Sequence, residues 1–255
     1  MITVGIDIGS ITTKIAVMDD RKLVYSDLSF SGYDMNRAWR DIFDKMLAAT
    51  RTKEADIDCL VSTGYGRKNV NIAHRQITEI SCHAAGARYF FPKARAVIDI
   101  GGQDSKSIRI DENGNVVDFV MNDKCAAGTG RFLEVMARAL EVDLADFAAL
   151  AGKAGKPVII SSMCTVFAES EVISMIARGE SREDIIAGIH DSIAARMVSM
   201  MKRTGLDKPV VMTGGVSRNA GMRAAIEKRI GLKLKVPQEA QTCGAIGAAL
   251  LAASP

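Results

Sequence analysis

The 255-residue sequence has few aromatic side chains and no run of one charge. Phe, Trp and Tyr make up 5% of the chain, and 33 basic residues are balanced by 30 acidic ones. Nucleic-acid binding, which uses basic patches and aromatic stacking, is therefore not indicated. The longest C-terminal apolar run, AIGAALLAA, is too short to cross a bilayer, and no basic leader precedes the first strand pattern. We expect a cytoplasmic protein that binds neither nucleic acid nor membrane.

Several familiar motifs are also missing. The chain has no G-x-x-x-x-G-K-[ST] loop and no G-x-G-x-x-G after a first strand, which excludes a Walker A site and a Rossmann dinucleotide site. It has no C-x-x-C pair either. Its cysteines are odd in number and widely spaced, so a disulfide framework is not indicated and metal binding or buried thiols remain. They are Cys59, Cys82, Cys125, Cys164 and Cys243.

Hydrophobic residues make up 48% of the chain, which is enough for a full core in one large domain or two lobes. Period-3.6 patterns predict helices over 34–50, 79–90, 131–141, 167–178, 183–204 and 219–230. Short apolar runs predict strands near 57–63, 95–100, 157–161 and 209–213. This alternation predicts a layered α/β protein.

An internal repeat organises these elements. The pattern I-D-I-G, four residues and then Lys occurs from Ile6 to Lys14 and again from Ile98 to Lys106. Each copy predicts a strand, a tight glycine turn and a return strand, and such turns hold phosphate through backbone N–H groups. A third junction follows an apolar strand at Gly214, where a helix opens near Asn219. A helix start of this kind can face an anionic ligand.

The repeat predicts two related lobes, residues 1–94 with 242–255 and residues 95–241, with the ligand in the crevice between them. Asp7 and Asp99 hold corresponding places in the two copies. If the lobes face each other, the two carboxylates meet across a cleft, which suits Mg²⁺ with a nucleotide. The alternative is that both aspartates only cap turns.

The turns supply the other candidate contacts. Phosphate contacts are predicted for Ser10, Ile11, Thr12, Thr13 and Lys14, and the adenosine side for Gly214, Gly215, Asn219 and Gln241. Gln103, Asp104 and Lys106 are predicted to position water or to close on the γ-phosphate, with Gln103 and Asp104 as the catalytic pair. Which carboxylate acts as the base stays open.

Two cysteines stand at predicted helix starts, Cys125 in NDKCAAGTGRFLE and Cys164 in SSMCTVFAESEVIS. A helix N-terminus stabilises a thiolate, which makes it a good metal ligand or nucleophile. The matched pair favours a metal ligand. The other three cysteines are predicted to be small buried hydrophobes. The histidines, His74, His83 and His190, are dispersed and predicted to serve packing.

GIDIGSITTK, DIGGQDSK and MTGGVSRNAG resemble the phosphate and adenosine motifs of the superfamily of acetate and sugar kinases, heat-shock 70-kilodalton chaperones and actin. Within it, NDKCAAGTGRFLEVMA and SSMCTVFAESEVIS resemble the activators of 2-hydroxyacyl-CoA dehydratases. These belong to the BadF/BadG/BcrA/BcrD ATPase family, which also holds the ATPase subunits of benzoyl-CoA reductase. The resemblance covers nearly the whole chain.

The resemblance implies a two-lobed actin-like ATPase with ribonuclease H-like lobes, ATP or ADP in the cleft and Mg²⁺ near Asp7 and Asp99. It implies a homodimer that shares one [4Fe-4S] cluster. Four thiolates are needed for an all-cysteine cluster, and Cys125 and Cys164 of two copies would supply them. Reduced ferredoxin or flavodoxin would give the electron, and a 2-hydroxyacyl-CoA dehydratase component would receive it after ATP hydrolysis.

Four alternatives remain. The chain could be an ATPase subunit of a benzoyl-CoA reductase-type enzyme or a small-molecule kinase of the same fold. A kinase would leave both helix-start cysteines without a role. A nucleotide-dependent interaction module is a third possibility, and a structural zinc with four cysteine ligands is the other metal site. The sequence does not name the acyl-CoA that a partner would use.

Overall fold

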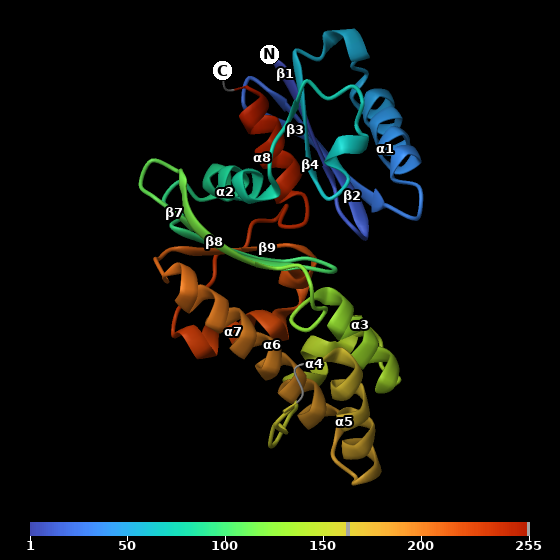
Figure 1. Cartoon of the computed structure of the whole chain (residues 1–255), viewed down its shortest axis with the longest axis vertical. Helices are drawn as coiled ribbons and strands as arrows, with labels where there is room; N and C mark the ends of the chain where they lie inside the picture. Colours follow the sequence, from blue (N-terminus) through green and yellow to red (C-terminus); the bar gives the residue numbers. More distant parts are fainter. Residues whose placement is uncertain (162–163, 254–255) are drawn as a thin grey trace.

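The computed structural model describes residues 1–161 and 164–253, so Ser162 and Met163 of the Cys164 motif and the last two residues of the predicted first lobe lie outside the described residues. Two sheets carry the fold (Figure 1). The first contains β1 (Ile2–Ile8), β2 (Thr12–Asp19), β3 (Lys22–Phe30), β4 (Cys59–Gly64) and β5 (Arg75–Gln76), in the order β3-β2-β1-β4-β5. The second contains β6 (Ala96–Ile100), β7 (Ser105–Ile110), β8 (Val116–Asn122) and β9 (Val210–Thr213), in the order β8-β7-β6-β9.

The two sheets repeat one arrangement, as the sequence repeat predicts. In each sheet an antiparallel hairpin, β1–β2 or β6–β7, lies beside a third strand that runs parallel to its first strand. The register is also the same, because Asp7 stands opposite Lys14 and Asp99 stands opposite Lys106. Each hairpin therefore brings an acid and a base to the same side of its turn.

The structure extends this repeat to the third strand of each lobe. β4 ends in Thr63 and Gly64, and β9 ends at Thr213, which Gly214 follows directly. Each threonine stands opposite the aspartate of its own lobe. Both glycines have φ +85°, and a Cβ on either would lie within 2.5 Å of a carbonyl oxygen of the first strand. Both positions therefore need glycine.

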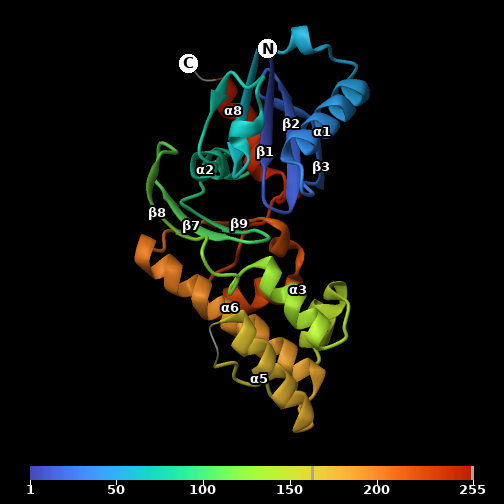
Figure 2. The ribbon, with the colours of Figure 1, turned by 45° about the vertical axis from the view of Figure 1, so that its right-hand side comes forward.

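The helices fill three layers around the sheets (Figures 1 and 2). Their bounds are α1 (Met35–Thr50), α2 (Glu79–Phe90), α3 (Gly130–Ala139), α4 (Phe147–Ala151), α5 (Thr165–Ala177), α6 (Arg182–Thr204), α7 (Ala220–Ile230) and α8 (Cys243–Ala252). α1 covers the outer face of the first sheet, and α6 and α7 cover the outer face of the second. No helix among the described residues is long and apolar enough to cross a membrane.

The middle layer consists of α2 and α8, which pack against each other between the sheets. α8 buries Ala245 and Ala249 against Ala16 and Met18 of β2. α2 turns its own apolar face, which includes Ala84, toward the second sheet. α8 therefore packs on the first sheet and on α2, while α2 also contacts the second sheet, so this pair of helices connects the two lobes.

The six predicted helices are confirmed, and no helix end differs from its predicted position by more than two residues. The predicted strands near 57–63, 95–100 and 209–213 are confirmed as β4, β6 and β9. The strand predicted over 157–161 is wrong, because these residues are irregular. Val158 N–H donates to the carbonyl of Asp184 at the start of α6, and Ile160 is buried in the core of the second lobe. The apolar run therefore covers a helix and pairs with no strand.

Glycine at position 247 sets the spacing of α2 and α8, which gives a prediction about stability. A Cβ on Gly247 would lie 1.7 Å from the carbonyl oxygen of Cys82, so the helices would have to move apart. We expect Gly247→Ala to lower the free energy of unfolding by about 3 kcal/mol, although alanine favours a helix by about 1 kcal/mol. Urea unfolding measures this. Gly152→Ala, whose Cβ would have ordinary contacts at 3.4 Å, is the matched control. Equal stability of the two variants would contradict the prediction.

Candidate nucleotide site

A cavity of about 580 Å³ opens between the two lobes. Its walls come from both hairpin turns, the start of α2, the start of α3 and the segments after β9. The residues that line it include Asp7, Gly9, Ser10, Ile11, Thr12, Lys14, Tyr65, Glu79, His83, Asp99, Gly101, Gly102, Asp104, Lys106, Gly130, Leu133, Glu134, Gly214, Gly215, Arg218, Asn219 and Gln241. Cavities of a few hundred cubic ångströms are of the size that holds a nucleotide-sized ligand.

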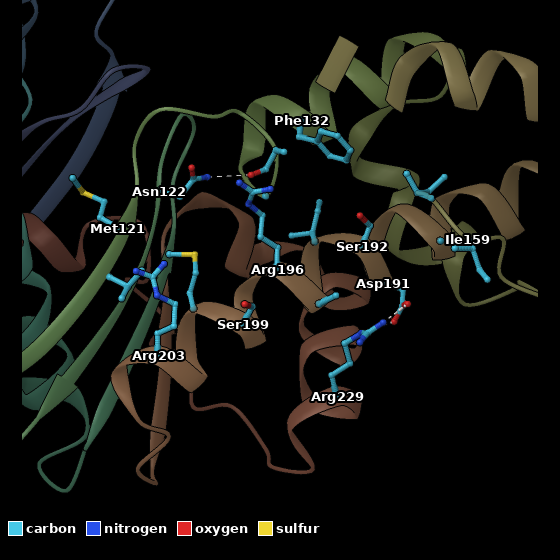
Figure 3. Close-up of a pocket in the computed structure, with 18 of the residues that line it drawn as sticks. Met121, Asn122, Phe132, Ile159, Asp191, Ser192, Arg196, Ser199, Arg203 and Arg229 are labelled. Carbon is cyan, nitrogen blue, oxygen red and sulfur yellow. Dashed lines mark hydrogen bonds and ion pairs between the residues drawn. The ribbon is translucent and has the colours of Figure 1, made fainter. Parts of the chain in front are cut away.

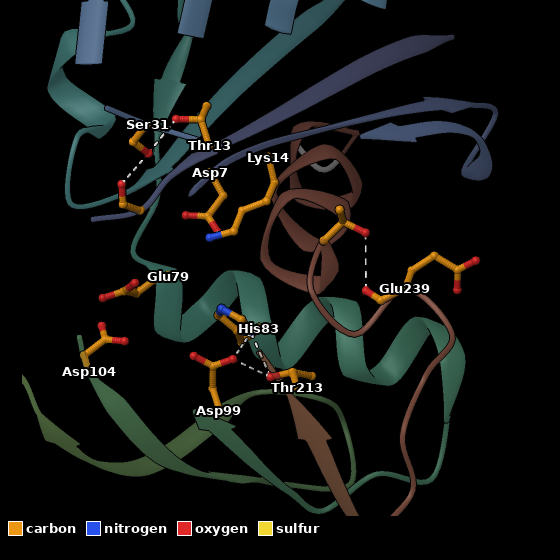
Figure 4. A network of polar contacts seen from close by, with 12 residues as sticks. Asp7, Thr13, Lys14, Ser31, Glu79, His83, Asp99, Asp104, Thr213 and Glu239 are labelled. Carbon is orange, nitrogen blue, oxygen red and sulfur yellow. Dashed lines mark hydrogen bonds and ion pairs between the residues drawn. The ribbon is translucent and has the colours of Figure 1, made fainter. Parts of the chain in front are cut away.

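Asp7 and Asp99 both line this cavity and both are buried (Figure 4). Asp7 Oδ2 lies 3.1 Å from Lys14 Nζ. Asp99 Oδ1 accepts a hydrogen bond from Thr213 Oγ1 at 2.7 Å, and its Oδ2 lies 3.3 Å from Lys106 Nζ. The expectation that the two repeats bring their carboxylates to one cavity is therefore met.

The charge state of Asp99 follows from these contacts. Burial alone would raise its pKa, but the charges of His83 and Lys106, together with the hydrogen bond from Thr213, hold the pKa well below its usual range. Lys14 of the other hairpin adds to this lowering of the pKa. Asp99 is thus a carboxylate near neutral pH, and the two hairpins act on each other's charges.

Lys106 is almost fully buried and is surrounded by carboxylates. Its Nζ lies 2.7 Å from Asp104 Oδ2, 3.3 Å from Asp99 Oδ2 and 3.5 Å from Glu79 Oε2. Burial lowers the pKa of Lys106, but the three carboxylates outweigh burial and raise it above its ordinary value. Lys106 therefore stays positively charged, and its charge balances part of the negative charge of the carboxylates beside it.

The first turn places most of its predicted phosphate contacts in the cavity. Gly9 N–H donates to the carbonyl of Thr12 at 3.0 Å and closes the turn. Ser10, Ile11, Thr12 and Lys14 line the cavity, but Thr13 does not. Because side chains alternate along a strand, the hydroxyl of Thr13 points to the opposite face and lies 3.0 Å from Ser31 Oγ. The prediction that the Thr13 side chain contacts phosphate is wrong.

The second turn is tied to helix α3. Gly101 N–H donates to the carbonyl of Asp104, and Asp104 lines the cavity as predicted. Gln103 is exposed and is not among the residues that line the cavity, so its catalytic role stays a prediction. The first two N–H groups of α3, those of residues 130 and 131, donate to the carbonyls of Gly101 and Gly102 at 2.9 and 2.8 Å. Movement of this turn would therefore move the start of α3.

The four residues predicted for the adenosine side all line the cavity; they are Gly214, Gly215, Asn219 and Gln241. Asn219 Oδ1 accepts the N–H of residue 222 and caps α7. Its Nδ2 lies 3.1 Å from Nε2 of His190. Burial lowers the pKa of His190 to about 4, so the ring is neutral near pH 7 and can accept this hydrogen bond. His190 thereby fixes Asn219 in place.

Two residues of α2 were missed by the predictions from sequence. Glu79, in the first turn of α2, and His83, one turn later, both line the cavity. Burial raises the pKa of Glu79, while Lys106 opposes this rise. His83 Nδ1 lies 3.1 Å from Thr213 Oγ1, and the prediction that His83 serves packing rather than catalysis stays a prediction. The i, i+4 spacing of an acid and a histidine was the available signal.

The two candidate ligand cysteines differ in setting. Cys164 is exposed and is the N-cap residue of α5, which confirms its predicted place at a helix start. Cys125 is half-buried against the core of the second lobe and lies five residues before α3 begins at Gly130. The prediction that Cys125 stands at a helix start is therefore wrong. Its carbonyl instead accepts a hydrogen bond from Asn122 Nδ2, which braces the loop.

The remaining cysteines have no metal-binding setting. Cys82 and Cys243 are buried between α2, α8 and the first sheet, and burial raises the pKa of Cys82 to about 12. Burial also raises the pKa of Cys243. Cys59 is half-buried and packs in the same region. Among the described residues, no three His, Cys, Asp or Glu side chains form a group that could hold a metal ion within one chain.

Two lobes that repeat a strand-turn-strand unit, with a cavity between their turns, define an actin-like ATPase fold. A ROK family glucokinase from Streptomyces griseus, solved with glucose and AMPPNP, has this fold in common with the chain, with a TM-score of 0.63 at 14% identity over 100% of both chains. The model of the BadF/BadG/BcrA/BcrD ATPase family matches residues 4–252. The chain belongs to this family.

Two relatives cover almost the whole chain. The (R)-2-hydroxyglutaryl-CoA dehydratase activating ATPase of Acidaminococcus fermentans is 49% identical over 252 residues, which are 98% of this chain and 96% of the relative. The solved activator of the 2-hydroxyisocaproyl-CoA dehydratase from Clostridium difficile, with bound ADPNP, matches with a TM-score of 0.92 and 45% identity. That match covers 99% of this chain and 94% of the solved one.

Proposed function

We propose that this protein is an ATP-driven activator that passes single electrons to a 2-hydroxyacyl-CoA dehydratase. The main observation behind the proposal is that hydrogen bonds connect the second phosphate turn directly to the start of α3. The carbonyls of Gly101 and Gly102 accept hydrogen bonds from the first two N–H groups of α3. Cys125 lies on the loop that leads into that helix. A nucleotide that moves the turn would therefore move the loop of Cys125. The similar activators named above support the same function.

The nucleotide would lie between the lobes. Ser10, Thr12 and Lys14 would contact its phosphates, and the side chains after β9 would contact the adenosine. Mg²⁺ commonly uses one or two carboxylates together with phosphates and water, so Asp7 and Asp99 fit this ion although the described residues form no three-residue metal group. The metal would neutralise phosphate charge. Glu79, whose pKa is raised by burial, and Asp104 are the candidates for orienting the attacking water.

An iron-sulfur cluster fits this chain only as a shared group. Cys125 and Cys164 are the two cysteines with exposed or half-exposed thiols in the second lobe, and an all-cysteine [4Fe-4S] cluster needs four. A second copy, related by a two-fold axis, would supply the other pair. When bound, the cluster would accept and release one electron. The exposed thiol of Cys164 at the N-terminus of α5 suits this role, because the helix dipole stabilises a thiolate there.

The surface of α5 supports a homodimer. Four apolar side chains on this helix, Val166, Phe167, Ile173 and Ile176, are exposed, Phe167 to 68%. They lie on the helix that Cys164 caps. Exposed apolar groups of this size commonly mark protein interfaces. A second copy that covers α5 would bring the two Cys164 residues to the same interface.

Within the dimer, closure of the lobes on ATP would pull the second turn and α3, and so would reposition the Cys125 loop. ATP hydrolysis would make electron transfer directional. The electron would come from a reduced ferredoxin or flavodoxin, and the dehydratase component would receive it. The acyl-CoA substrate would bind to the dehydratase and not to this chain.

Anaerobic reconstitution tests the proposal. The protein is combined with reduced ferredoxin, Mg²⁺, ATP and, in separate assays, dehydratases specific for 2-hydroxyglutaryl-CoA, 2-hydroxyisocaproyl-CoA and lactoyl-CoA. We expect ATP-dependent dehydration with at least one of them, and none when AMPPNP replaces ATP. The proposed function would be contradicted if protein with its full iron content hydrolysed ATP but activated none of the three dehydratases.

A further inference from the structure

A second cavity, of about 610 Å³, lies between β8 and α6 in the second lobe (Figure 3). It is bounded by β8, the loop at residues 127–128, the irregular segment at residues 158–160 and one side of α6. None of the residues that line it also lines the nucleotide cavity. The proposed nucleotide chemistry therefore gives this cavity no role.

One stripe of α6 supplies its polar wall. Ser192, Arg196, Ser199 and Arg203 all line the cavity and follow each other at intervals of three or four residues, so they project from one side of the helix. Hydroxyl and guanidinium groups thus alternate along the wall. Both kinds of group donate hydrogen bonds to an anion.

The two guanidinium groups on this stripe lack a protein partner. Neither Arg196 nor Arg203 has a hydrogen bond or ion pair with another residue in the described part of the chain. Arg229, at the edge of the same cavity, differs because its Nε donates to Asp191 Oδ1 at 2.7 Å. Asp191 is the one carboxylate that lines the cavity, and Arg229 already engages it. The cavity therefore has an excess of positive charge.

The opposite wall is apolar. Phe132 of α3 and Ile160 are buried, and Val120 of β8 packs against the same core cluster. The stem of Arg196 packs against the loop, since a Cβ on Gly128 would lie 2.9 Å from Arg196 Cδ. This contact holds the guanidinium end of a half-buried side chain at the cavity. An occupant that satisfies both walls needs an anionic group and an apolar body.

We propose that this cavity binds an organic carboxylate with an apolar chain, through Arg196 and Arg203. The guanidinium groups bind the carboxylate, with Ser192 and Ser199 as further donors, and the apolar chain lies against Phe132 and Ile160. An inorganic anion would leave the apolar wall exposed to water, and a neutral apolar molecule would leave the guanidinium groups unpaired. The site does not depend on the proposed electron transfer.

Calorimetric titration of the homogeneous protein with octanoate tests this. We expect binding by the wild type, and weaker binding of octan-1-ol and of sulfate. The double variant Arg196→Gln with Arg203→Gln is expected to lose at least tenfold in octanoate affinity. The matched control is Arg182→Gln with Lys202→Gln, which removes the same charge from the exposed surface of α6 outside the cavity. ADP titration and circular dichroism of each variant show whether it has folded.

The exposed apolar side of α5 is the competing place for octanoate. Octanoate that binds the two double variants equally well would overturn the proposal, because binding would then not use Arg196 and Arg203. Failure of the wild type to bind octanoate would overturn it as well. Because the cavities share no lining residue, ADP and octanoate are expected to bind together. Strictly competitive binding of the two, with no complex that holds both, would place octanoate in the nucleotide cavity and also overturn the proposal.

Discussion

Replacing Cys164 by serine is expected to abolish the iron content of the anaerobically purified protein, and replacing Cys125 by serine is expected to do the same. A shared [4Fe-4S] cluster corresponds to about four iron atoms per dimer, so one substitution removes two of its four thiolates at once. Serine keeps the size of the side chain but is a poor ligand for this cluster. The brown colour, the visible absorption and an iron assay measure the loss.

The protein offers a control within the same chain. Cys59 is half-buried and free like Cys125, but it packs in the first lobe beside α2 and α8. Cys59→Ser is expected to keep the full iron content. Analytical ultracentrifugation of all three variants shows whether each keeps the oligomeric state of the wild type. If Cys125→Ser or Cys164→Ser purified with about four iron atoms per dimer, the ligand set proposed for the shared site would be wrong.

The settings of the two cysteines show what the sequence could and could not predict about this site. Cys164 stands at a helix start because the periodic pattern of α5 begins directly after it. Cys125 was assigned to a helix start because its loop contains a glycine turn, yet the turn needs five residues before α3 begins. Thr129, the N-cap residue, donates its side chain to the carbonyl of residue 126 and prolongs the loop. Capping contacts of this kind determine the residue at which a helix begins, and hydrophobic periodicity alone does not show that residue.

Much of the nucleotide site was predictable because it is built on a repeat. A matched Asp and Lys in two copies required two hairpins in the same register, and the structure has them. The further match between Thr63 with Gly64 and Thr213 with Gly214 was overlooked, because two residues are too short a pattern to stand out in a sequence. Its reason is steric, since each glycine has a positive φ beneath a neighbouring strand.

The contacts of α2 with the cavity were not predicted from the sequence. Periodicity identified the helix but did not show that its first turn would face the ligand cavity, because this depends on how α2 packs between α8 and the second sheet. Glu79 and His83 were therefore missed. The error at Thr13 has a simpler cause, since alternate side chains of a strand point to opposite faces and Thr12 and Lys14 already occupy the cavity side.

Asp99→Asn is expected to lower the rate of ATP hydrolysis by at least about 100-fold, which corresponds to roughly 3 kcal/mol of activation free energy. The substitution removes the charge with which Asp99 would hold Mg²⁺. Lys106 would keep two carboxylate partners, Asp104 and Glu79, so its own charge would survive. The kcat for ATP and the Mg²⁺ concentration that gives half-maximal rate measure the effect, and that concentration is expected to rise.

Loss of a buried carboxylate can also destabilise a protein, so the rate must be separated from folding. Breaking a buried ion pair costs about 3–5 kcal/mol, and bound ADP would offset part of this. Asp27→Asn is the matched control, because Asp27 is a half-buried carboxylate paired with Lys45 at 2.6 Å outside the cavity. An Asp99→Asn protein that binds ADP but hydrolyses ATP slowly supports a role for the carboxylate in metal binding. If the variant hydrolysed ATP at the wild-type rate with an unchanged Mg²⁺ requirement, the role of Asp99 would instead be to hold the side chains of Thr213 and Lys106 in place.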